Sequence, residues 1–145
     1  MRRSTPAIIV SLFLLAMIFW TDRAKAAEAE TELVVHTVSY HFDRSQEWNE
    51  RNFGAGLRFQ HSNGYSSQFG TYKNSYNRRT WYAVGQKQWP IYSVHAGVFA
   101  GAVTGYDSPV AAGLMLSTNN LTFRLIPPAG PQTTGVLALE FHKTF

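Results

Sequence analysis

Apolar and polar residues alternate along most of the chain beyond residue 26. In Leu121–Ile126 every second residue is Leu or Phe, with Thr and Arg between them. Toward the C-terminus, Leu137 and Phe141 fall on the face opposite Glu140 in the same way. A period of two residues is typical of β-strands with one buried face, and no stretch repeats the 3.6-residue period of an amphipathic helix.

Eight segments with this pattern, each bounded by turn residues, are predicted as strands. They are Glu32–Phe42, Phe53–His61, Tyr65–Lys73, Thr80–Gln88, Tyr92–Val103, Pro109–Ser117, Leu121–Ile126 and Gly135–Phe145. Short connections at Ser62–Gly64, Trp89–Ile91 and Thr118–Asn120 alternate with generally longer ones. Short turns at one end and longer loops at the other indicate an up-and-down antiparallel barrel of the outer-membrane type.

The charged residues distinguish a membrane barrel from a soluble one. A lipid-facing Arg or Lys at mid-bilayer costs roughly 2–4 kcal/mol, so a membrane barrel must turn its charges into the lumen. Arg58, Lys73, Lys87 and Arg124 can all be placed inward, and Lys143 lies at the chain end, where it can reach water. The alternative is a soluble, lipocalin-like barrel with its apolar face inside. The pattern favours an all-β, eight-stranded antiparallel transmembrane β-barrel.

One strand fits this assignment poorly. If Lys73 faces the lumen, the alternation in Tyr65–Lys73 turns Ser66 and Gln68 toward lipid and Phe69 toward the lumen.

The N-terminal residues differ from the rest in composition. Arg2 and Arg3 precede an uncharged run from Ala7 to Trp20, and Ala24–Ala26 supplies small residues at the positions that a signal peptidase reads. This pattern predicts a cleaved signal peptide over residues 1–26 and a single barrel domain over residues 27–145. The uncharged run is too short for the roughly 20 residues of a spanning helix.

Removal of this segment changes the charge balance. It carries four of the thirteen Lys and Arg residues and one of the nine acidic ones, so nine basic and eight acidic residues remain. No basic stripe suggests a nucleic-acid partner. The chain has no cysteine, which excludes disulfides and thiolate chemistry.

His41 and Ser75 are the candidate reactive residues. His41 ends the first predicted strand and Ser75 follows the third, so the topology places both at the end of the longer loops. A hydroxyl becomes a useful nucleophile when a base within hydrogen-bond reach takes its proton. The alternative is that both are ordinary residues of a polar barrel rim.

Several short motifs in this region resemble a known family. Tyr40–Phe42, Trp48–Arg51 followed by Gly54–Gly56, and Tyr72–Arg78 are similar to motifs of the outer-membrane lipid A palmitoyltransferases. The similarity continues in order to the closing strand. This resemblance implies transfer of a palmitoyl chain from a phospholipid to lipid A, with the acyl chain held inside the barrel.

The resemblance also implies a set of site residues. The family's histidine falls on His41, its serine on Ser75 and its aspartate on Asn74. An Asn cannot carry the negative charge that orients or polarises a histidine, so Asn74 is expected to position groups through hydrogen bonds. The carboxylates of the first loop that could substitute for the aspartate are those of Asp43, Glu47 and Glu50.

The resemblance further implies a lateral route for lipid, because the family has prolines that interrupt strand pairing. Pro109 and Pro127 fall near one such route. Glycines of the strands could make room for an acyl chain; they are Gly54, Gly56, Gly97 and Gly101.

Two other functions remain open. Phe59–Gly64 resembles the His-Ser motif of lipid A deacylases, but Asn-Gly between two strands is also the strongest short hairpin signal. A non-catalytic barrel with an adhesion, resistance or membrane-integrity role needs no Ser/His pair.

The remaining expectations concern the lumen and the partners. Arg124 and Glu140 are expected to pair inside the barrel, and His95 and His142 to point inward. No spaced carboxylate cluster suggests a metal, and no cofactor is expected. The expected partners are outer-membrane phospholipid and lipid A, together with the barrel-assembly machinery during insertion. A monomer is expected.

Overall fold

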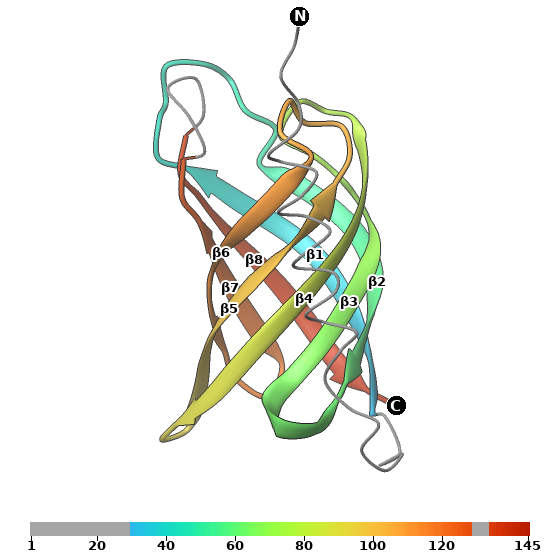
Figure 1. The fold of residues 1–145 in the computed structure, drawn as a ribbon. Coiled ribbons are helices and arrows are strands. Elements are labelled where there is room, and N and C mark those ends of the chain that lie inside the picture. The colour runs from blue at the N-terminus through green and yellow to red at the C-terminus, as the bar shows by residue number, and fades with distance from the viewer. Residues whose placement is uncertain (1–29, 129–133) are drawn as a thin grey trace, which may run out of the picture.

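The computed structural model describes residues 30–128 and 134–145. The predicted signal peptide, residues 1–26, lies outside this range. Eight strands follow one another along the chain (Figure 1). They are β1 (Thr31–His41), β2 (Arg51–Gln60), β3 (Tyr65–Lys73), β4 (Arg79–Ile91), β5 (Val94–Val103), β6 (Val110–Ser117), β7 (Leu121–Ile126) and β8 (Val136–Thr144).

Each strand pairs antiparallel with its neighbours in sequence, and β1 pairs with β8, so the sheet closes into a barrel. The closing ladder runs from Glu32 opposite Thr144 to His41 opposite Val136. Closure removes the unpaired edges that an open sheet would present. The prediction of an eight-stranded up-and-down barrel is confirmed. Within the described residues, no helix is long and apolar enough to cross a membrane.

The connections separate the two ends of the barrel. The β2–β3, β4–β5 and β6–β7 connections lie at one end, and the β1–β2, β3–β4 and β5–β6 loops lie at the other. The β2–β3 turn contains Asn63 and Gly64, both with positive φ (59° and 74°). This is the backbone that an Asn-Gly hairpin requires, so the hairpin interpretation of this motif is confirmed.

The β4–β5 turn differs from the prediction. Trp89–Ile91, predicted as the turn, continues β4, and Pro90 stands opposite His95 in the ladder. Tyr92 and Ser93 make the turn, with a positive φ of 54° at Tyr92. A proline near a strand end removes few ladder hydrogen bonds, which explains why it does not stop the strand here.

The outer surface of the barrel is apolar, and the charged side chains of the strand interiors point into the lumen. Phe123 and Phe141 are exposed on the outer surface, whereas Arg124 and Glu140 on the same two strands are buried. The outward face thus carries the oily side chains, as the alternation predicted.

The prediction that Lys73 and Lys87 face the lumen was wrong. Ser66 and Gln68 are buried in the lumen and Phe69 is exposed, so Lys73 faces outward. Lys87 also faces outward, where its ammonium lies 4.0 Å from the centre of the Tyr65 ring. Both lysines lie near strand ends, and neither joins the buried polar contacts.

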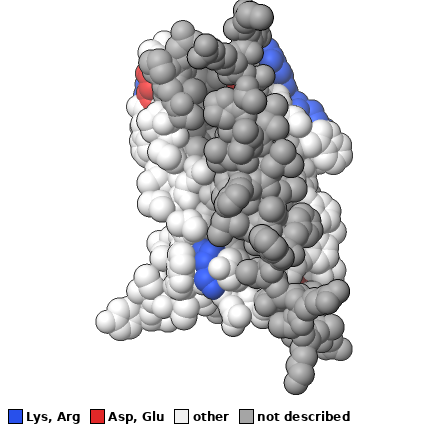
Figure 2. Space-filling model, in the orientation of Figure 1, with Lys and Arg blue, Asp and Glu red and all other residues white. Residues whose placement is uncertain are grey.

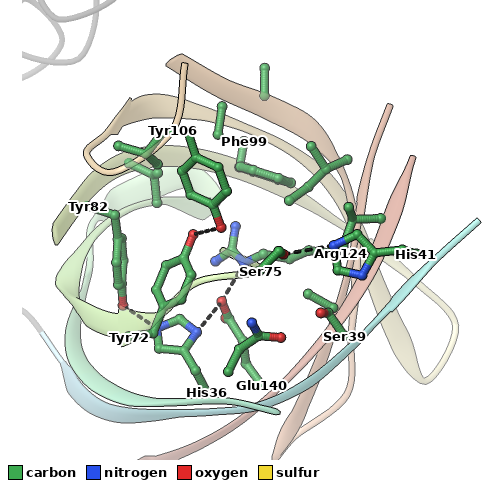
Figure 3. Close-up of a pocket in the computed structure, with 18 of the residues that line it drawn as sticks. His36, Ser39, His41, Tyr72, Ser75, Tyr82, Phe99, Tyr106, Arg124 and Glu140 are labelled. Carbon is green, nitrogen blue, oxygen red and sulfur yellow. Dashed lines mark hydrogen bonds and ion pairs between the residues drawn. The ribbon is translucent and has the colours of Figure 1, made fainter. Parts of the chain in front are cut away.

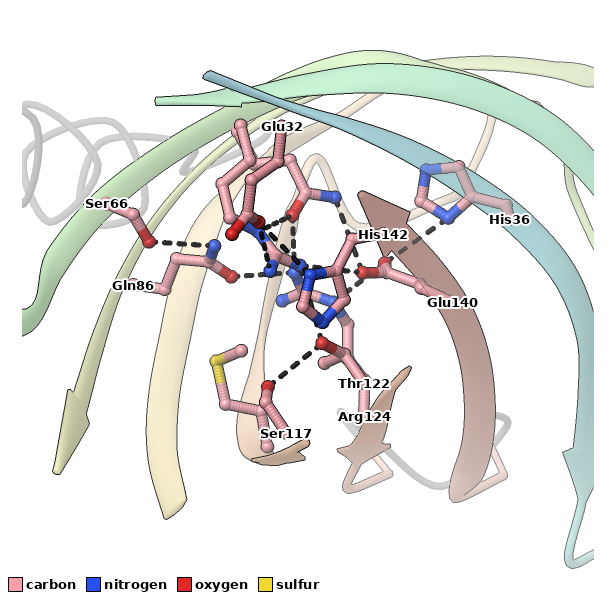
Figure 4. A network of polar contacts seen from close by, with 12 residues as sticks. Glu32, His36, Ser66, Gln86, Ser117, Thr122, Arg124, Glu140 and His142 are labelled. Carbon is pink, nitrogen blue, oxygen red and sulfur yellow. Dashed lines mark hydrogen bonds and ion pairs between the residues drawn. The ribbon is translucent and has the colours of Figure 1, made fainter. Parts of the chain in front are cut away.

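Two arginines and two glutamates fill the half of the lumen nearer the short turns (Figure 4). Arg58 Nη1 lies 3.0 Å from Glu32 Oε2, and its Nη2 lies 3.4 Å from Glu140 Oε2. Arg124 Nε lies 2.8 Å from Glu140 Oε1, which confirms the predicted pair. Gln68 Oε1 accepts hydrogen bonds from both guanidinium groups, at 3.0 and 2.9 Å.

Neutral polar groups and histidines surround these charges. His36 Nδ1 lies 3.3 Å from Glu140, and His142 Nδ1 lies 3.3 Å from Glu32, so His142 points inward as predicted. His95 lies on the inward side of β5 but is exposed, because it stands at the open end of the strand. Buried charges are tolerated where partners compensate them, and here two cations meet two carboxylates.

Glu140→Gln should strongly destabilise the barrel. The substitution keeps the shape of the side chain but leaves Arg58 and Arg124 with one buried carboxylate, and breaking a buried pair costs roughly 3–5 kcal/mol. The free energy of unfolding of the purified protein, from a denaturant titration, measures this. Glu47→Gln, on the exposed first loop, is the matched control. Equal unfolding free energies for the two variants would contradict the role given to the network.

Candidate active site

The structure brings His41 and Ser75 together at the mouth of a cavity (Figure 3). His41 is the last residue of β1, and Ser75 lies in the turn between β3 and β4. The distance from His41 Nε2 to Ser75 Oγ is 2.7 Å. This is a hydrogen bond of the length that general-base activation of a hydroxyl requires. The two candidates from the sequence therefore form one site.

Asn74 holds the turn that presents Ser75. Its Oδ1 accepts hydrogen bonds from the backbone N–H groups of Tyr76 and Arg78, at 3.0 and 2.9 Å. Its Nδ2 donates to Thr80 Oγ1 at 3.0 Å and to the carbonyl oxygen of Gly105 at 2.9 Å. None of these bonds reaches His41. Asn74 is thus a positioning residue, and its two donor contacts explain why an amide rather than a carboxylate suits this place.

Glu50 is the first-loop carboxylate that lies beside the histidine. Its Oε1 accepts a hydrogen bond of 3.1 Å from the backbone N–H of His41 and lies 3.6 Å from His41 Nδ1. The second distance is too long for a hydrogen bond, so this contact is electrostatic. Arg44 also donates to the same oxygen. Asp43 instead caps its own loop through the amide and hydroxyl of Ser45.

Neighbouring groups set the protonation of the loop side chains. The backbone N–H of His41, and then Arg44, hold the pKa of the Glu50 carboxyl below its usual range, which keeps it ionised. Burial raises the pKa of the Tyr106 phenol, so this hydroxyl stays protonated beside Ser75. An anion therefore faces the histidine, and a neutral donor stands near the serine.

Aromatic rings fix the orientation of the imidazole. The Trp48 ring stacks on the His41 ring, with centroids 4.7 Å apart and an angle of 8° between the planes. Tyr76 in turn packs against Trp48, and Tyr106 against Tyr76. His41 itself is 1% exposed. Tyr106 is a site residue that the sequence did not indicate, and Trp48 was noted only as the first residue of a motif.

The cavity below the pair has a volume of about 450 Å³, within the range of small-molecule sites. Its walls are largely apolar, with residues such as Val84, Phe99 and Leu139. Arg124 and Glu140 of the buried network also line it. The cavity thus has the His41–Ser75 pair at its entrance, apolar walls, and the charged side chains of Arg124 and Glu140 at its inner end.

The glycines do not make this space. A side chain at Gly54 would collide with Tyr72, and one at Gly56 with the hydroxyl of Tyr82. Gly97 is packed against Gln88 in the same way. Backbone and side-chain atoms of the neighbouring strands already fill the room left by these glycines, and none of them lines the cavity, so the prediction that they admit a ligand was wrong.

The barrel wall is interrupted beside the cavity. Among the residues that the structure describes, the β6–β7 ladder runs only from Leu114 to Ser117 on β6, whereas the β5–β6 ladder reaches Val110. Pro127 and Pro128 follow β7 directly and cannot donate ladder hydrogen bonds. Val110, Ile126 and Pro127 line the cavity. The unpaired stretch of β6 lies where the resemblance placed a lateral route.

The second histidine motif lies at the opposite end of the barrel. His61 Nε2 is 2.9 Å from Ser67 Oγ; His61 directly precedes the β2–β3 turn, and Ser67 lies on β3 just after it. His61 and Ser67 do not line the cavity below His41 and Ser75. In residues 30–128 and 134–145, no group of three or more His, Asp or Glu side chains is placed to hold a metal ion.

Asn74→Asp should loosen the Ser75 turn at neutral pH. The introduced carboxylate cannot donate to Thr80 or Gly105, and an unsatisfied buried group costs about 1–3 kcal/mol, with more for a charge. Asn77→Asp adds the same charge on an exposed part of the turn and is the control. Denaturant unfolding of both variants measures the difference. An unchanged or raised stability for Asn74→Asp would contradict the positioning role.

No protein-family model matches the sequence, and no curated protein matches it. The similarity to palmitoyltransferase motifs stays a prediction, and the chemistry of the site is inferred from its residues and their geometry.

Proposed function

We propose that this protein is an outer-membrane acyltransferase that moves an acyl chain from a phospholipid to lipid A. The observation that carries the proposal is the 2.7 Å contact between His41 Nε2 and Ser75 Oγ at the mouth of an apolar-walled cavity. The lipid substrates themselves come from the motif resemblance. The closed barrel supplies the frame on which the two side chains are fixed.

The distribution of side chains supports a location in the outer membrane. Leu, Phe and Val side chains are exposed around the barrel, and the charged network lies inside it. A lipid bilayer stabilises this arrangement, whereas water would leave the outer apolar surface uncovered. Insertion by the barrel-assembly machinery, after export through the predicted signal peptide, completes this part of the proposal.

The reaction proceeds in two halves. In the first, His41 Nε2 takes the proton of Ser75 Oγ as this oxygen attacks the ester carbonyl of the donor lipid. The ester C–O bond breaks, and the departing glycerol oxygen receives the proton from His41. In the second half, His41 takes the proton of an acceptor hydroxyl, which attacks the Ser75 ester. Ser75 Oγ then leaves and regains the proton.

Each neighbouring group has a place in this scheme. Glu50 stabilises the imidazolium that forms in each half, because its carboxylate lies 3.6 Å from Nδ1. The neutral Tyr106 hydroxyl near Ser75 can donate to the oxyanion of the tetrahedral intermediate. The acyl chain occupies the cavity, and the unpaired stretch of β6 gives it a way in from the bilayer.

Ser75→Ala and His41→Ala should both abolish acyl transfer. The first removes the nucleophile, and the second removes a general base whose contribution is typically 10²–10⁴-fold. Expression in a Gram-negative host, followed by mass spectrometry of lipid A and phospholipids, measures the product. Palmitoylated lipid A that is lost in both variants supports transfer.

The His61–Ser67 pair offers a matched control at the other end of the barrel. His61→Ala and Ser67→Ala should leave the lipid profile of the wild type unchanged. If these two variants lose the product and Ser75→Ala keeps it, the site lies at the β2–β3 turn. Deacylated lipid A would indicate hydrolysis in place of transfer. An unchanged lipid A profile from correctly inserted wild-type protein would favour the non-catalytic barrel.

Glu50→Gln should slow the reaction of Ser75 less than His41→Ala does. The amide keeps the hydrogen bond from the His41 backbone but loses the charge that faces Nδ1. The rate of covalent labelling of the purified protein by a fluorophosphonate, which reacts with activated serines, measures this without the natural lipid. Glu47→Gln is the control. Equal labelling rates for Glu50→Gln and wild type would remove Glu50 from the mechanism.

A further inference from the structure

Four basic side chains gather at one edge of the barrel end that carries Ser75. Arg51 begins β2, Lys73 ends β3, and Arg78 and Arg79 lead into β4. All four are exposed. Figure 2 shows Lys and Arg side chains along this edge of the barrel end, with acidic side chains visible on its other side. We call these four residues the cationic rim.

The cationic rim lacks compensating charge. Among the residues that the structure describes, none of the four takes part in an ion pair. Glu50, next to Arg51 in the sequence, is bound to Arg44 and to His41. Lys73 stands directly opposite Arg79 in the β3–β4 ladder, and like charges in this position destabilise a sheet. Unbalanced charges of this kind attract anions from outside the chain.

The cationic rim lies just beyond a pair of aromatic side chains. Phe53 and Trp81 follow Arg51 and Arg79 by two residues on the same outward faces, and they are 64% and 63% exposed. Two residues of strand place the cations about 7 Å further toward the barrel end. Aromatic belts mark the membrane interface, so cations at this distance beyond them reach the depth of lipid phosphates.

The opposite end of the barrel shows that lysines on the outer surface are not by themselves such a site. Lys87 is held over the Tyr65 ring and donates to the Asn63 carbonyl oxygen. Lys143 is separated from it in the barrel, since β8 and β4 are not neighbours. The cationic rim is instead continuous over β2, β3 and β4. It also flanks the nucleophile, because Lys73 and Arg78 bracket Ser75 in the chain.

We propose that Arg51, Lys73, Arg78 and Arg79 bind the phosphate groups of an anionic lipid and hold this lipid beside Ser75. The inference rests on the proposed function for its membrane placement, and it adds the group by which the substrate is held. Guanidinium groups suit phosphate because their donors match its oxygens in pairs. Free phosphate presents the same chemistry, so the test includes it.

The test measures binding to the purified full-length protein in a neutral detergent. The probes are dioctanoyl phosphatidic acid, dioctanoyl phosphatidylcholine and inorganic phosphate, with bound lipid detected by native mass spectrometry. Wild type should bind phosphatidic acid at least about tenfold more tightly than phosphatidylcholine, and less tightly as salt rises. The triple variant Arg51→Gln/Lys73→Gln/Arg79→Gln should lose roughly tenfold or more of this affinity, since each cation near a membrane surface contributes separately.

Two further variants make the result specific. Lys87→Gln/Lys143→Gln removes two cations from the opposite end and should bind phosphatidic acid as wild type does. Arg51→Lys/Arg79→Lys keeps the charges and should retain most of the binding. Equal affinity of wild type for the two lipids, or unchanged binding by the triple variant, would overturn the proposal. Full displacement of the lipid by inorganic phosphate at equal concentration would overturn the assignment to a lipid.

Two measurements, phosphatidic acid binding and fluorophosphonate labelling of Ser75, distinguish a failure of this inference from a failure of the proposed function. Ser75→Ala should bind phosphatidic acid as wild type does. If the rim fails to bind while fluorophosphonate still labels Ser75, the rim proposal alone falls. If binding is retained but Ser75 is unreactive, the acyl-transfer proposal falls and the lipid site stands.

Discussion

A buried ion network joins strands of the barrel to one another across the lumen. Arg58 and Arg124 meet Glu32 and Glu140 with distances of 2.8–3.4 Å between partners. These contacts link β1, β2, β7 and β8 across the interior, and Gln68 adds β3. The network also sets where the barrel has room. Charged side chains fill one half, and the cavity with its apolar walls occupies the other, next to the loops.

Most of the fold could be predicted from the period-two pattern, because most strands carry one continuous apolar face. β3 and β7 begin and end at the predicted residues. The pattern could not say which face of β3 is inward, since Ser and Tyr occur on both faces of this strand. Gln68 faces inward because it is hydrogen-bonded to the lumen network, and the alternation along β3 then turns Lys73 outward. The turn at Tyr92 was not predicted, because a proline such as Pro90 usually marks the end of a strand.

The site could be predicted in part. Topology alone placed His41 and Ser75 at one barrel end, and the structure joins them. The choice of Glu50 among three loop carboxylates depends on how the loop folds, and this follows from contacts such as that with Arg44, which no spacing reveals. Stacking of Trp48 on His41 is likewise a long-range consequence of loop conformation.

The buried ion network below the cavity affects the order in which lipids can bind at the site. Because the network fills the lumen beneath the cavity, the cavity is a blind chamber, reached from the loop end or from the unpaired side of β6. If Ser75 transfers acyl groups, the chain held on it stays in the chamber while the rest of the donor departs. A second intact lipid cannot insert its chain until the first is released. Under the proposed acyl transfer, this geometry favours ping-pong turnover, in which the donor lipid and the acceptor lipid use the same entrance one after the other.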